Sequence, residues 1–319
     1  MDPRYARGPI WRVLLRKRGN VRRHSPVHYM NSSDDKSALN VKDIQRRFDR
    51  AAARFDSADF VHSTTRGGLL ARLEPIVIEA KTVIDLGSAT GSGSRLLARH
   101  FRGAHVIATD LSHNMVERAQ KKQSWFARTS AVQANATALP FAEQSIDVVF
   151  ANLLLPWIDN AARVFTEVSR VLRKDGLFLF ATLGPDSLNE LRRAWHGVDT
   201  CEHVRSFLDM HDIGDAAVRA GLRDPVLDVD KLSITYRDAG TLFADLTAVG
   251  ARNSLQHRDR SLGSAAAFRA MSEALDALRE DGLLRLDLEI VYGHCWGSGR
   301  QALDGEYRVA ATQIGRRQR

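Results

Sequence analysis

The sequence contains little cysteine and no long apolar run. Cys201 and Cys295 are the only cysteines among the 319 residues, and they stand far apart without the spacing of metal ligands. They predict free thiols in a reducing cytoplasm, with no disulfide framework and no metal site. No stretch approaches the roughly 18 apolar residues that span a membrane, and the apolar residues 10–15 are interrupted by Arg12. The composition argues against a secreted disulfide scaffold and against a membrane protein.

Internal repeats and low-complexity segments are also missing from the sequence. Hydrophobic residues make up 44% of the chain and charged residues 26%, which is typical of a folded domain with a sizeable core. The length of 319 residues fits one large domain or two ordinary ones. Because no linker rich in proline and serine divides the chain, we expect one α/β domain.

The net charge of +8 suggests a nucleic-acid partner until its location is considered. Residues 1–29 contain eight arginines and lysines against Asp2, and residues 316–319 add three more arginines. The chain between Met30 and Gly315 is therefore close to neutral. We expect no nucleic-acid binding by the folded part.

The first 29 residues admit three interpretations. They form a disordered basic arm, or they extend a reading frame whose real start is Met30, or they form an arginine-rich segment that targets an organelle. They lack the apolar segment of a secretory signal. The sequence leaves the three interpretations open.

Strand and helix patterns alternate along the rest of the chain. The apolar spacing after Val41 predicts a helix that continues to about Glu74. The alternation that follows predicts a mostly parallel, doubly wound sheet with ligands at the carboxyl ends of its strands. We expect the later helices to fold over the sheet edge as a lid. The expected strands are residues 82–86, 105–109, 131–135, 146–151, 176–183, 226–236 and 286–292, and the expected helices are 92–101, one capped by Ser112, 161–172, 185–195, 210–220, 239–249 and 264–279.

A loop of small residues follows the first expected strand: Val83-Ile-Asp-Leu-Gly-Ser-Ala-Thr-Gly-Ser-Gly-Ser94. A Walker A loop would need a lysine after its last glycine, and none stands there. A dinucleotide loop would need a second glycine at the position of Ala89, which weakens the case for NAD. The pattern that remains is Asp85-x-Gly87-x-Ala89-x-Gly91, whose small residues let a ligand approach the backbone.

Asp110 ends the second expected strand, where a carboxylate can accept both hydroxyls of a ribose. The loop and Asp110 together resemble the class I S-adenosylmethionine-dependent methyltransferases, whose motif I reads D/E-x-G-x-G-x-G. In that family the segment D-A-x-x-L-P-F binds adenine, and here it reads Asn135-Ala-Thr-Ala-Leu-Pro-Phe141. The resemblance implies a Rossmann-like fold with a seven-stranded sheet, and S-adenosylmethionine as cofactor.

The resemblance also implies a set of cofactor-binding residues. Asp85 would lie near the cofactor's ammonium group, and the amide oxygen of Asn135 would accept a hydrogen bond from the adenine amine. The loop positions would leave room for the methionine-derived tail. The full expected set is Asp85, Gly87, Ala89, Gly91, Asp110, Leu111, Asn135, Ala136 and Asn152.

Segments outside this core carry a narrower resemblance. The stretches "IQRRFDRAAARFD", "NLLLPWIDN", "LGPDSLNELRRAW", "TYRDAGTLFADLTAVGARN" and "VYGHCWG" are similar to malonyl-acyl-carrier-protein O-methyltransferases of biotin synthesis, the BioC family. Two positions depart from that family, because Phe55 stands where tyrosine is common and Pro156 where glutamine is common. A sister family, the mitochondrial complex I assembly factors implicated in arginine hydroxylation, shares most of these segments.

The narrower resemblance implies methyl transfer to the free carboxylate of malonyl-acyl-carrier protein or malonyl-CoA. That carboxylate is ionised at pH 7, so no strong base is required and we assign no catalytic residue. Arg205 and Arg252 are candidates for orienting the malonyl group or receiving the carrier, although a structural role is the simpler reading of each. Trp157 is either a pocket wall or ordinary core.

The alternative function is that of an assembly factor that binds the cofactor but acts on a protein arginine. For the chain as a whole we expect a cytoplasmic enzyme. We divide it into a basic arm over 1–40, a methyltransferase domain with C-terminal lid helices over 41–297, and a basic tail over 298–319. The sequence gives no information on the oligomeric state.

Overall fold

The computed structural model describes residues 14–16, 39–122, 128–255 and 265–299. Most of the predicted basic arm and tail therefore lie outside the described residues. The division at residues 40 and 297 stays a prediction. Leu39 and Asn40 already belong to the fold, because Leu39 is buried and Asn40 caps the first helix through its side chain.

The strands form a single sheet in the order β1-β7-β8-β6-β5-β2-β3-β4. Neighbouring strands from β4 across to β6 are parallel, whereas β8 runs antiparallel to both β6 and β7. This confirms the predicted seven-stranded, mostly parallel sheet, to which β1 adds a short strand beside β7. The strands are β1 (Leu14–Arg16), β2 (Thr82–Leu86), β3 (His105–Asp110), β4 (Thr129–Gln133), β5 (Ile146–Asn152), β6 (Leu172–Leu183), β7 (Leu222–Tyr236) and β8 (Leu284–Gly297).

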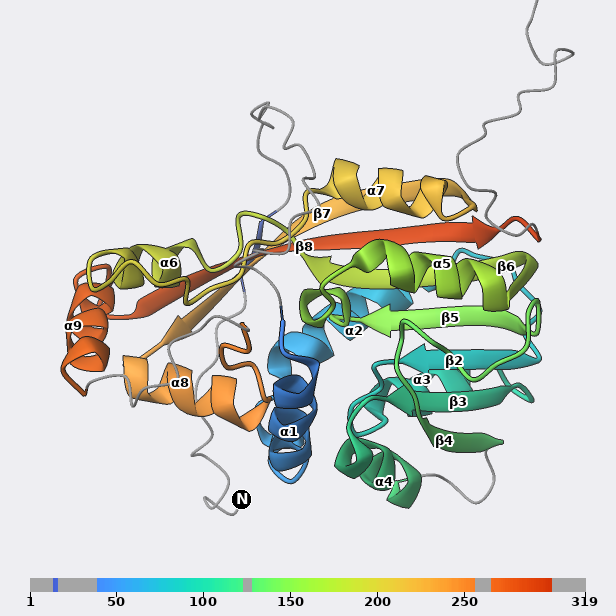
Figure 1. Cartoon of the computed structure of the whole chain (residues 1–319), viewed down its shortest axis with the longest axis horizontal. Coiled ribbons are helices and arrows are strands. Elements are labelled where there is room, and N and C mark those ends of the chain that lie inside the picture. The colour runs from blue at the N-terminus through green and yellow to red at the C-terminus, as the bar shows by residue number, and fades with distance from the viewer. Residues whose placement is uncertain (1–13, 17–38, 123–127, 256–264, 300–319) are drawn as a thin grey trace, which may run out of the picture.

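Helices cover both faces of the sheet (Figure 1). Successive residues of a strand point to opposite faces, so Val83 belongs to the buried cluster that includes side chains of α2 and α3, while Ile84 belongs to the cluster that includes side chains of α5 and α7. The helices are α1 (Val41–Ala51), α2 (Phe60–Leu73), α3 (Ser92–His100), α4 (His113–Lys121), α5 (Ala161–Val171), α6 (Asn189–His196), α7 (Met210–Arg219), α8 (Ala239–Ala248) and α9 (Ala265–Asp276), with short 3-10 turns η1 (Phe55–Ser57) and η2 (Leu155–Trp157).

The prediction of one continuous helix from Val41 to Glu74 is wrong. The chain forms α1, a corner that contains η1, and then α2. Within the corner, the Asp56 carboxylate accepts from the Thr90 hydroxyl and pairs with the Lys122 ammonium group. These partners lie far along the chain, so tertiary contacts hold a bend that the local apolar spacing does not reveal. The other expected elements are present, with ends that differ by a few residues.

The helices predicted to form a lid lie beside two long strands, β7 and β8, and none of their residues lines the described cavities, so the lid stays a prediction. The pairing of β6 with β8 ends at Leu183 and Ile290, but the pairing of β7 with β8 continues to Tyr236 and Leu284. Helices α6, α8 and α9 surround this extension, at the left of Figure 1. Their apolar side chains, including Leu242, belong to the same buried cluster as the sheet. These three helices and the sheet therefore share one core.

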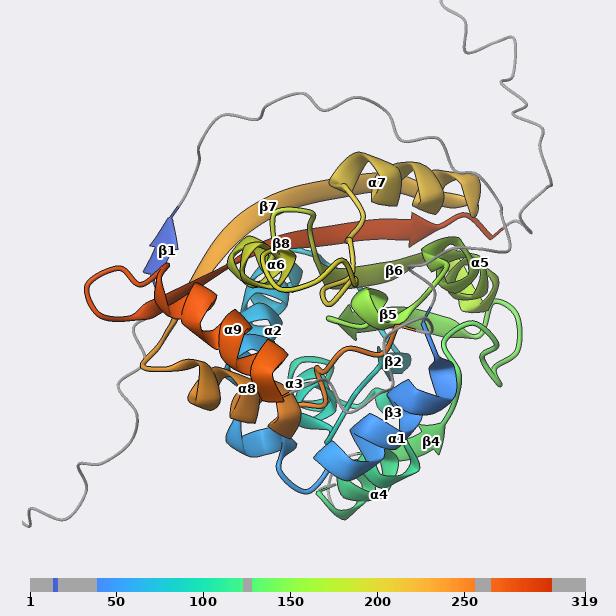
Figure 2. The same ribbon diagram turned by 60° about the vertical axis from the view of Figure 1, so that its left-hand side comes forward.

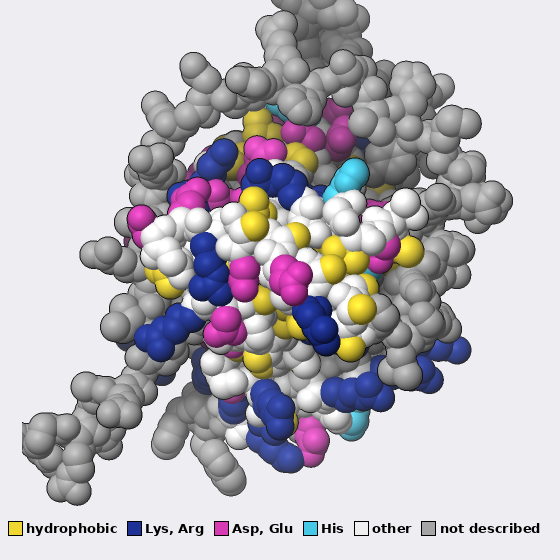
Figure 3. Space-filling model, turned by 90° about the vertical axis from the view of Figure 1, so that its left-hand side faces the viewer, with side chains coloured by type: hydrophobic (Ala, Val, Ile, Leu, Met, Phe, Trp, Pro, Cys, Tyr) yellow, Lys and Arg dark blue, Asp and Glu magenta, His cyan; other side chains and the backbone are white. Residues whose placement is uncertain are grey.

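The lid end of the molecule shows basic and acidic side chains interspersed, with scattered apolar groups between them (Figure 3). Within the described residues, no helix combines the length and the apolar character needed to cross a bilayer.

Candidate functional site

A cavity of about 690 Å³ opens at the carboxyl ends of β2, β3 and β5. Figures 1 and 2 place α1 beside these strand ends, and Ile44 and Phe48 of this helix line the cavity. The cavity is lined by Ile44, Phe48, Phe55, His62, Leu86, Gly87, Ala89, Thr109, Asp110, Leu111, Ala134, Asn135, Ala136, Asn152, Leu153, Leu154, Trp157 and Ile158.

The small-residue loop runs from β2 to α3 and forms one wall of this cavity. The N–H groups of Gly87 and Ser88 both donate to the carbonyl oxygen of Thr109, at 2.8 and 2.9 Å, which ties the loop to β3. Gly91 caps α3 at φ +79°, a left-handed conformation that favours glycine. Ala89 adopts a positive φ of 47° as well. The alanine that departs from motif I therefore takes a conformation in which glycine would be less strained.

Asp110 holds Ala89 in this conformation. Its carboxylate accepts from the N–H of Ala89 and from the N–H of Ser112, each at 2.9 Å. Burial raises the pKa of Asp110 to about 6. The Ser112 hydroxyl accepts from the N–H of Met115, which confirms the predicted helix cap and leaves Asp110 free of that task. Because each carboxylate oxygen has a second lone pair, Asp110 can still accept from a ligand.

Asp85 lies beneath the loop and is 3% exposed. Its carboxylate accepts from the Ser94 hydroxyl at 2.6 Å, near the N-terminus of α3. Burial raises the pKa of Asp85 to about 6. Asp85 also lines a second, smaller cavity of about 320 Å³ together with Arg66. A buried carboxylate with a raised pKa is suited to a cationic ligand, because a positive charge favours its ionised form.

Asn135 lies at the exposed rim of the larger cavity. Its amide oxygen accepts from the N–H and from the hydroxyl of Thr137, both at 3.0 Å, and so closes a turn. The neighbouring Ala136 is buried against the same cavity, and Leu111 lines it from the end of β3. Both lone pairs of the Asn135 oxygen are therefore engaged, and the proposed contact with adenine would have to replace one of these two hydrogen bonds.

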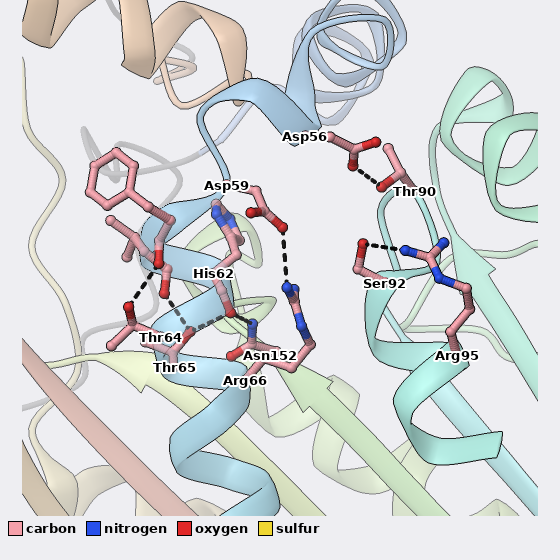
Figure 4. A network of polar contacts seen from close by, with 12 residues as sticks. Asp56, Asp59, His62, Thr64, Thr65, Arg66, Thr90, Ser92, Arg95 and Asn152 are labelled. Atoms are coloured by element: carbon pink, nitrogen blue, oxygen red, sulfur yellow. Dashed lines mark hydrogen bonds and ion pairs between the residues drawn. The ribbon is translucent and has the colours of Figure 1, made fainter. Parts of the chain in front are cut away.

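Asn152 and His62 border both cavities. The Asn152 amide donates to the backbone oxygen of His62 at 2.9 Å. Two atoms, the Asn152 Oδ1 and the His62 Nδ1, are buried and have no hydrogen-bond partner among the described residues. Figure 4 shows both side chains beside α2. Because both residues border the cavities, a ligand or a water molecule bound there can complete these two atoms.

Apolar side chains from α1 and η2 close the larger cavity. Phe48 and Trp157 meet edge to face with ring centroids 5.1 Å apart, and Ile44 lies beside them. Trp157 therefore forms a wall of the cavity, which is one of the two interpretations that the sequence left open. Phe55 is 3% exposed, and its ring lies 4.9 Å from that of His62, so it presents an apolar surface to the cavity.

The sequence did not identify all of these residues. The apolar spacing of α1 marked Ile44 and Phe48 as one face, but it did not show what that face covers. His62 carried no signal, because it lies in a stretch without a motif. The two arginine candidates are absent from the residues that line the described cavities. Arg205 donates to the backbone oxygens of Pro156 and Asp159, and Arg252 donates to the Thr247 hydroxyl.

Among the described residues, no group of three or more histidine, cysteine, aspartate or glutamate side chains could hold a metal ion.

The sheet order, the loop after β2 and the cavity at the strand ends define a class I methyltransferase. A family model described as a methyltransferase domain matches residues 84–180.

The chain belongs to the malonyl-acyl-carrier-protein O-methyltransferase family. A relative with that name from Laribacter hongkongensis is 41% identical over 79% of this chain and 88% of its own length. Another from Gallionella capsiferriformans is 39% identical over 81% and 91%. The names of these relatives do not support the alternative of an arginine-modifying assembly factor.

Solved structures share the fold at low sequence identity. The Bacillus subtilis YcgJ protein matches with a TM-score of 0.52 at 16% identity, over 74% of this chain and 98% of that one. A structure containing a Haloferax volcanii methyltransferase and its Trm112 activator matches with a TM-score of 0.51 at 19% identity, over 80% and 97%. At these identities the likeness shows the fold alone.

Proposed function

We propose that this enzyme transfers a methyl group from S-adenosylmethionine to the free carboxylate of malonyl-acyl-carrier protein, giving the methyl ester that primes the pimeloyl chain of biotin. The observation that carries the proposal is the likeness to relatives of this name over most of their length. The test is complementation of a biotin auxotroph that lacks its methyltransferase, together with a methyl-transfer assay on purified malonyl-acyl-carrier protein. Failure in both experiments would refute the proposal.

The residues at the strand ends fit the cofactor. Asp110 would accept the ribose hydroxyls, and Leu111 and Ala136 would contact the adenine at the wall they form. Asp85 and the unsatisfied Oδ1 of Asn152 would face the cationic amino-acid end. The small residues 87, 89 and 91 would leave the tail access to the backbone. When bound, the cofactor would supply an electrophilic methyl group.

The chain's own contribution would be alignment and the exclusion of water. The malonyl carboxylate is ionised at pH 7, so no general base is required. Ile44, Phe48 and Trp157 form an apolar cover over the cavity. A water-poor site strips the carboxylate of competing hydrogen bonds and holds it in line with the methyl group. The rate of methyl transfer would therefore depend on the position of the carboxylate relative to the methyl group, without any proton transfer.

Cofactor affinity should fall at mildly acidic pH. Burial raises the pKa of Asp85 to about 6, and a cationic ligand would lower it again. Below pH 6 binding must therefore release a proton, which weakens affinity by about tenfold between pH 7 and pH 5 for each carboxylate involved. Calorimetry in buffers of different ionisation enthalpy measures both quantities. Asp85→Asn should reduce the released protons, and affinity unchanged down to pH 5 would contradict the assignment.

The exposed face of α1 suggests how the carrier is received. Lys42, Arg46 and Arg50 are exposed and spaced four residues apart, and Arg54 follows at the same interval. Arg46 comes only within 3.9 Å of Asp43. The opposite face of this helix covers the cavity through Ile44 and Phe48. A row of cations beside the site opening suits an acidic carrier protein better than a small thioester.

Replacing Arg46 and Arg50 together by glutamate should raise the KM for malonyl-acyl-carrier protein by about tenfold at low salt, because complementary charge governs encounter. The KM for malonyl-pantetheine, which carries no phosphate, should stay unchanged. A matched control is Arg99→Glu with Arg102→Glu, two exposed positions, one in the last turn of α3 and one between α3 and β3, at the amino ends of the strands. An equal effect on both substrates would refute the docking role, and a wild-type preference for malonyl-CoA would point to a small-molecule substrate.

We also propose a cytoplasmic location, where the exposed thiol of Cys201 would stay reduced. The second cysteine, Cys295, is buried in β8, and burial raises the pKa of its thiol, so it has no reactive role.

A further inference from the structure

His62 stands where the two cavities meet. It lies in the first turn of α2, and it lines both the larger cavity beside Asp110 and the smaller cavity beside Asp85. Only Phe55, Gly87, Ala89 and Asn152 share this property among the cavity-lining residues. If the adenosine part of the cofactor fills one cavity and its amino-acid part the other, His62 faces the point where they join.

The His62 ring packs against one neighbouring ring, and one of its nitrogens is unsatisfied. The ring packs against Phe55, and the backbone oxygen of His62 accepts the Asn152 amide. Its Nδ1 is buried and lacks a partner among the described residues. A buried polar atom without a partner is costly, so its retention in an ordered pocket points to a ligand that completes it.

The surroundings keep the imidazole neutral. Burial lowers the pKa of His62 to about 4, and the nearby Arg66 guanidinium lowers it further. The acidic groups close by are already engaged, since Asp59 pairs with Arg66 at 3.2 Å and Asp85 accepts from Ser94. Figure 4 shows Asp59, His62 and Arg66 on the same side of α2. The ring therefore offers one N–H donor and one acceptor at neutral pH.

We propose that His62 is the substrate-positioning residue: a ring N–H donates a hydrogen bond to the malonyl carboxylate that receives the methyl group. This inference rests on the proposed function. In the step, a carboxylate oxygen forms the new bond to the methyl carbon while the sulfur–methyl bond breaks and its electron pair stays on sulfur. No proton moves, so His62 needs to orient the carboxylate and not to titrate.

A neutral donor suits this task better than a cation. A cationic side chain would hold the carboxylate lone pairs tightly and would repel a sulfonium in the same pocket. An uncharged N–H fixes the direction of the carboxylate and leaves the attacking lone pair available. In agreement with the requirement for a neutral donor, this position holds a histidine, and the nearby Arg66 is paired with Asp59.

The test compares His62→Leu, which removes the hydrogen bond, with His62→Gln, which keeps a neutral N–H donor. His62→Leu should raise the KM for malonyl-acyl-carrier protein and lower kcat, with kcat/KM reduced by about tenfold or more, the loss expected for a hydrogen bond to a charged group. The dissociation constant of S-adenosylmethionine, from calorimetry, should change less than about threefold. His62→Gln should recover most of kcat/KM.

The wild-type kcat/KM should stay level between pH 6.5 and 8, because the ring does not titrate there. Thermal unfolding checks that each variant folds. If His62→Leu does not fold, the kcat/KM of His62→Gln tests the positioning role of His62. Unchanged kcat/KM in His62→Leu, or equal loss of cofactor affinity, would overturn this inference while leaving the proposed function intact. A folded wild type that binds the cofactor but methylates no malonyl thioester would overturn the proposed function itself.

Discussion

Asp110→Ala should weaken S-adenosylmethionine binding by about a hundredfold and abolish measurable methyl transfer at ordinary cofactor concentrations. The carboxylate would accept two ribose hydroxyls, and hydrogen bonds to a charged group contribute about 1.5–3 kcal/mol each. It also accepts the N–H groups of Ala89 and Ser112, so its removal opens the loop that forms the cavity wall. Calorimetry and a methyl-transfer assay measure the two losses.

A second carboxylate separates cofactor binding from simple loss of stability. Asp147 also accepts two backbone N–H groups, those of Lys81 and Thr82 at 2.8 Å each, but at the opposite end of β2. Asp147→Ala should lower the free energy of unfolding by about 1–3 kcal/mol, as Asp110→Ala should, because both leave N–H groups unpaired. Cofactor affinity should survive only in Asp147→Ala. Equal affinity losses would reduce Asp110 to a structural role.

Gly93→Ala should have the second largest effect. A methyl group at this position would lie 2.8 Å from Asp85 Oδ2 and 3.2 Å from Oδ1, so the carboxylate must move. Such overpacking costs about 1–3 kcal/mol of stability. The displaced Asp85 would also lose its place beside the ligand cavity, so we expect cofactor affinity to fall by at least about tenfold. Thermal unfolding and calorimetry measure the two effects.

Gly67→Ala is the matched control for this substitution. Gly67 is also helical, and a methyl group there meets no atom within 4 Å. Alanine should stabilise α2 by about 0.5–1 kcal/mol and leave cofactor binding unchanged, because glycine is a poor helix former. If Gly93→Ala binds the cofactor as well as Gly67→Ala does, the position of Asp85 is irrelevant to binding.

The sheet could be predicted because its strands carry a simple signal. Runs such as Thr82–Leu86 are apolar and bounded by small or polar residues, and the helices between them have one apolar face. The loop after β2 was also readable, because the demand for small residues is local. The sequence also indicated that Asp110 does not cap the next helix, because Ser112 stands at the cap position.

The rest depends on contacts between distant residues. The corner at Phe55–Ser57 is held by Thr90 and Lys122, neither of which changes the local pattern around Asp56. The place of His62 at the site follows only from the folded chain, in which α2 contacts Asn152 of β5. The positive φ of Ala89 follows from the Asp110 carboxylate, which no propensity for alanine would suggest. Such features belong to the assembled fold.

The two strands that extend beyond β6 have a consequence for how the molecule unfolds. Leu242 of the predicted lid and Val83 of the sheet belong to one buried cluster, and the pairing of β7 with β8 continues from Val226 to Tyr236 through both parts. Releasing the lid would therefore expose core side chains and break a ladder that the sheet also uses. We therefore expect the helices of the predicted lid and the sheet to unfold as a single cooperative unit.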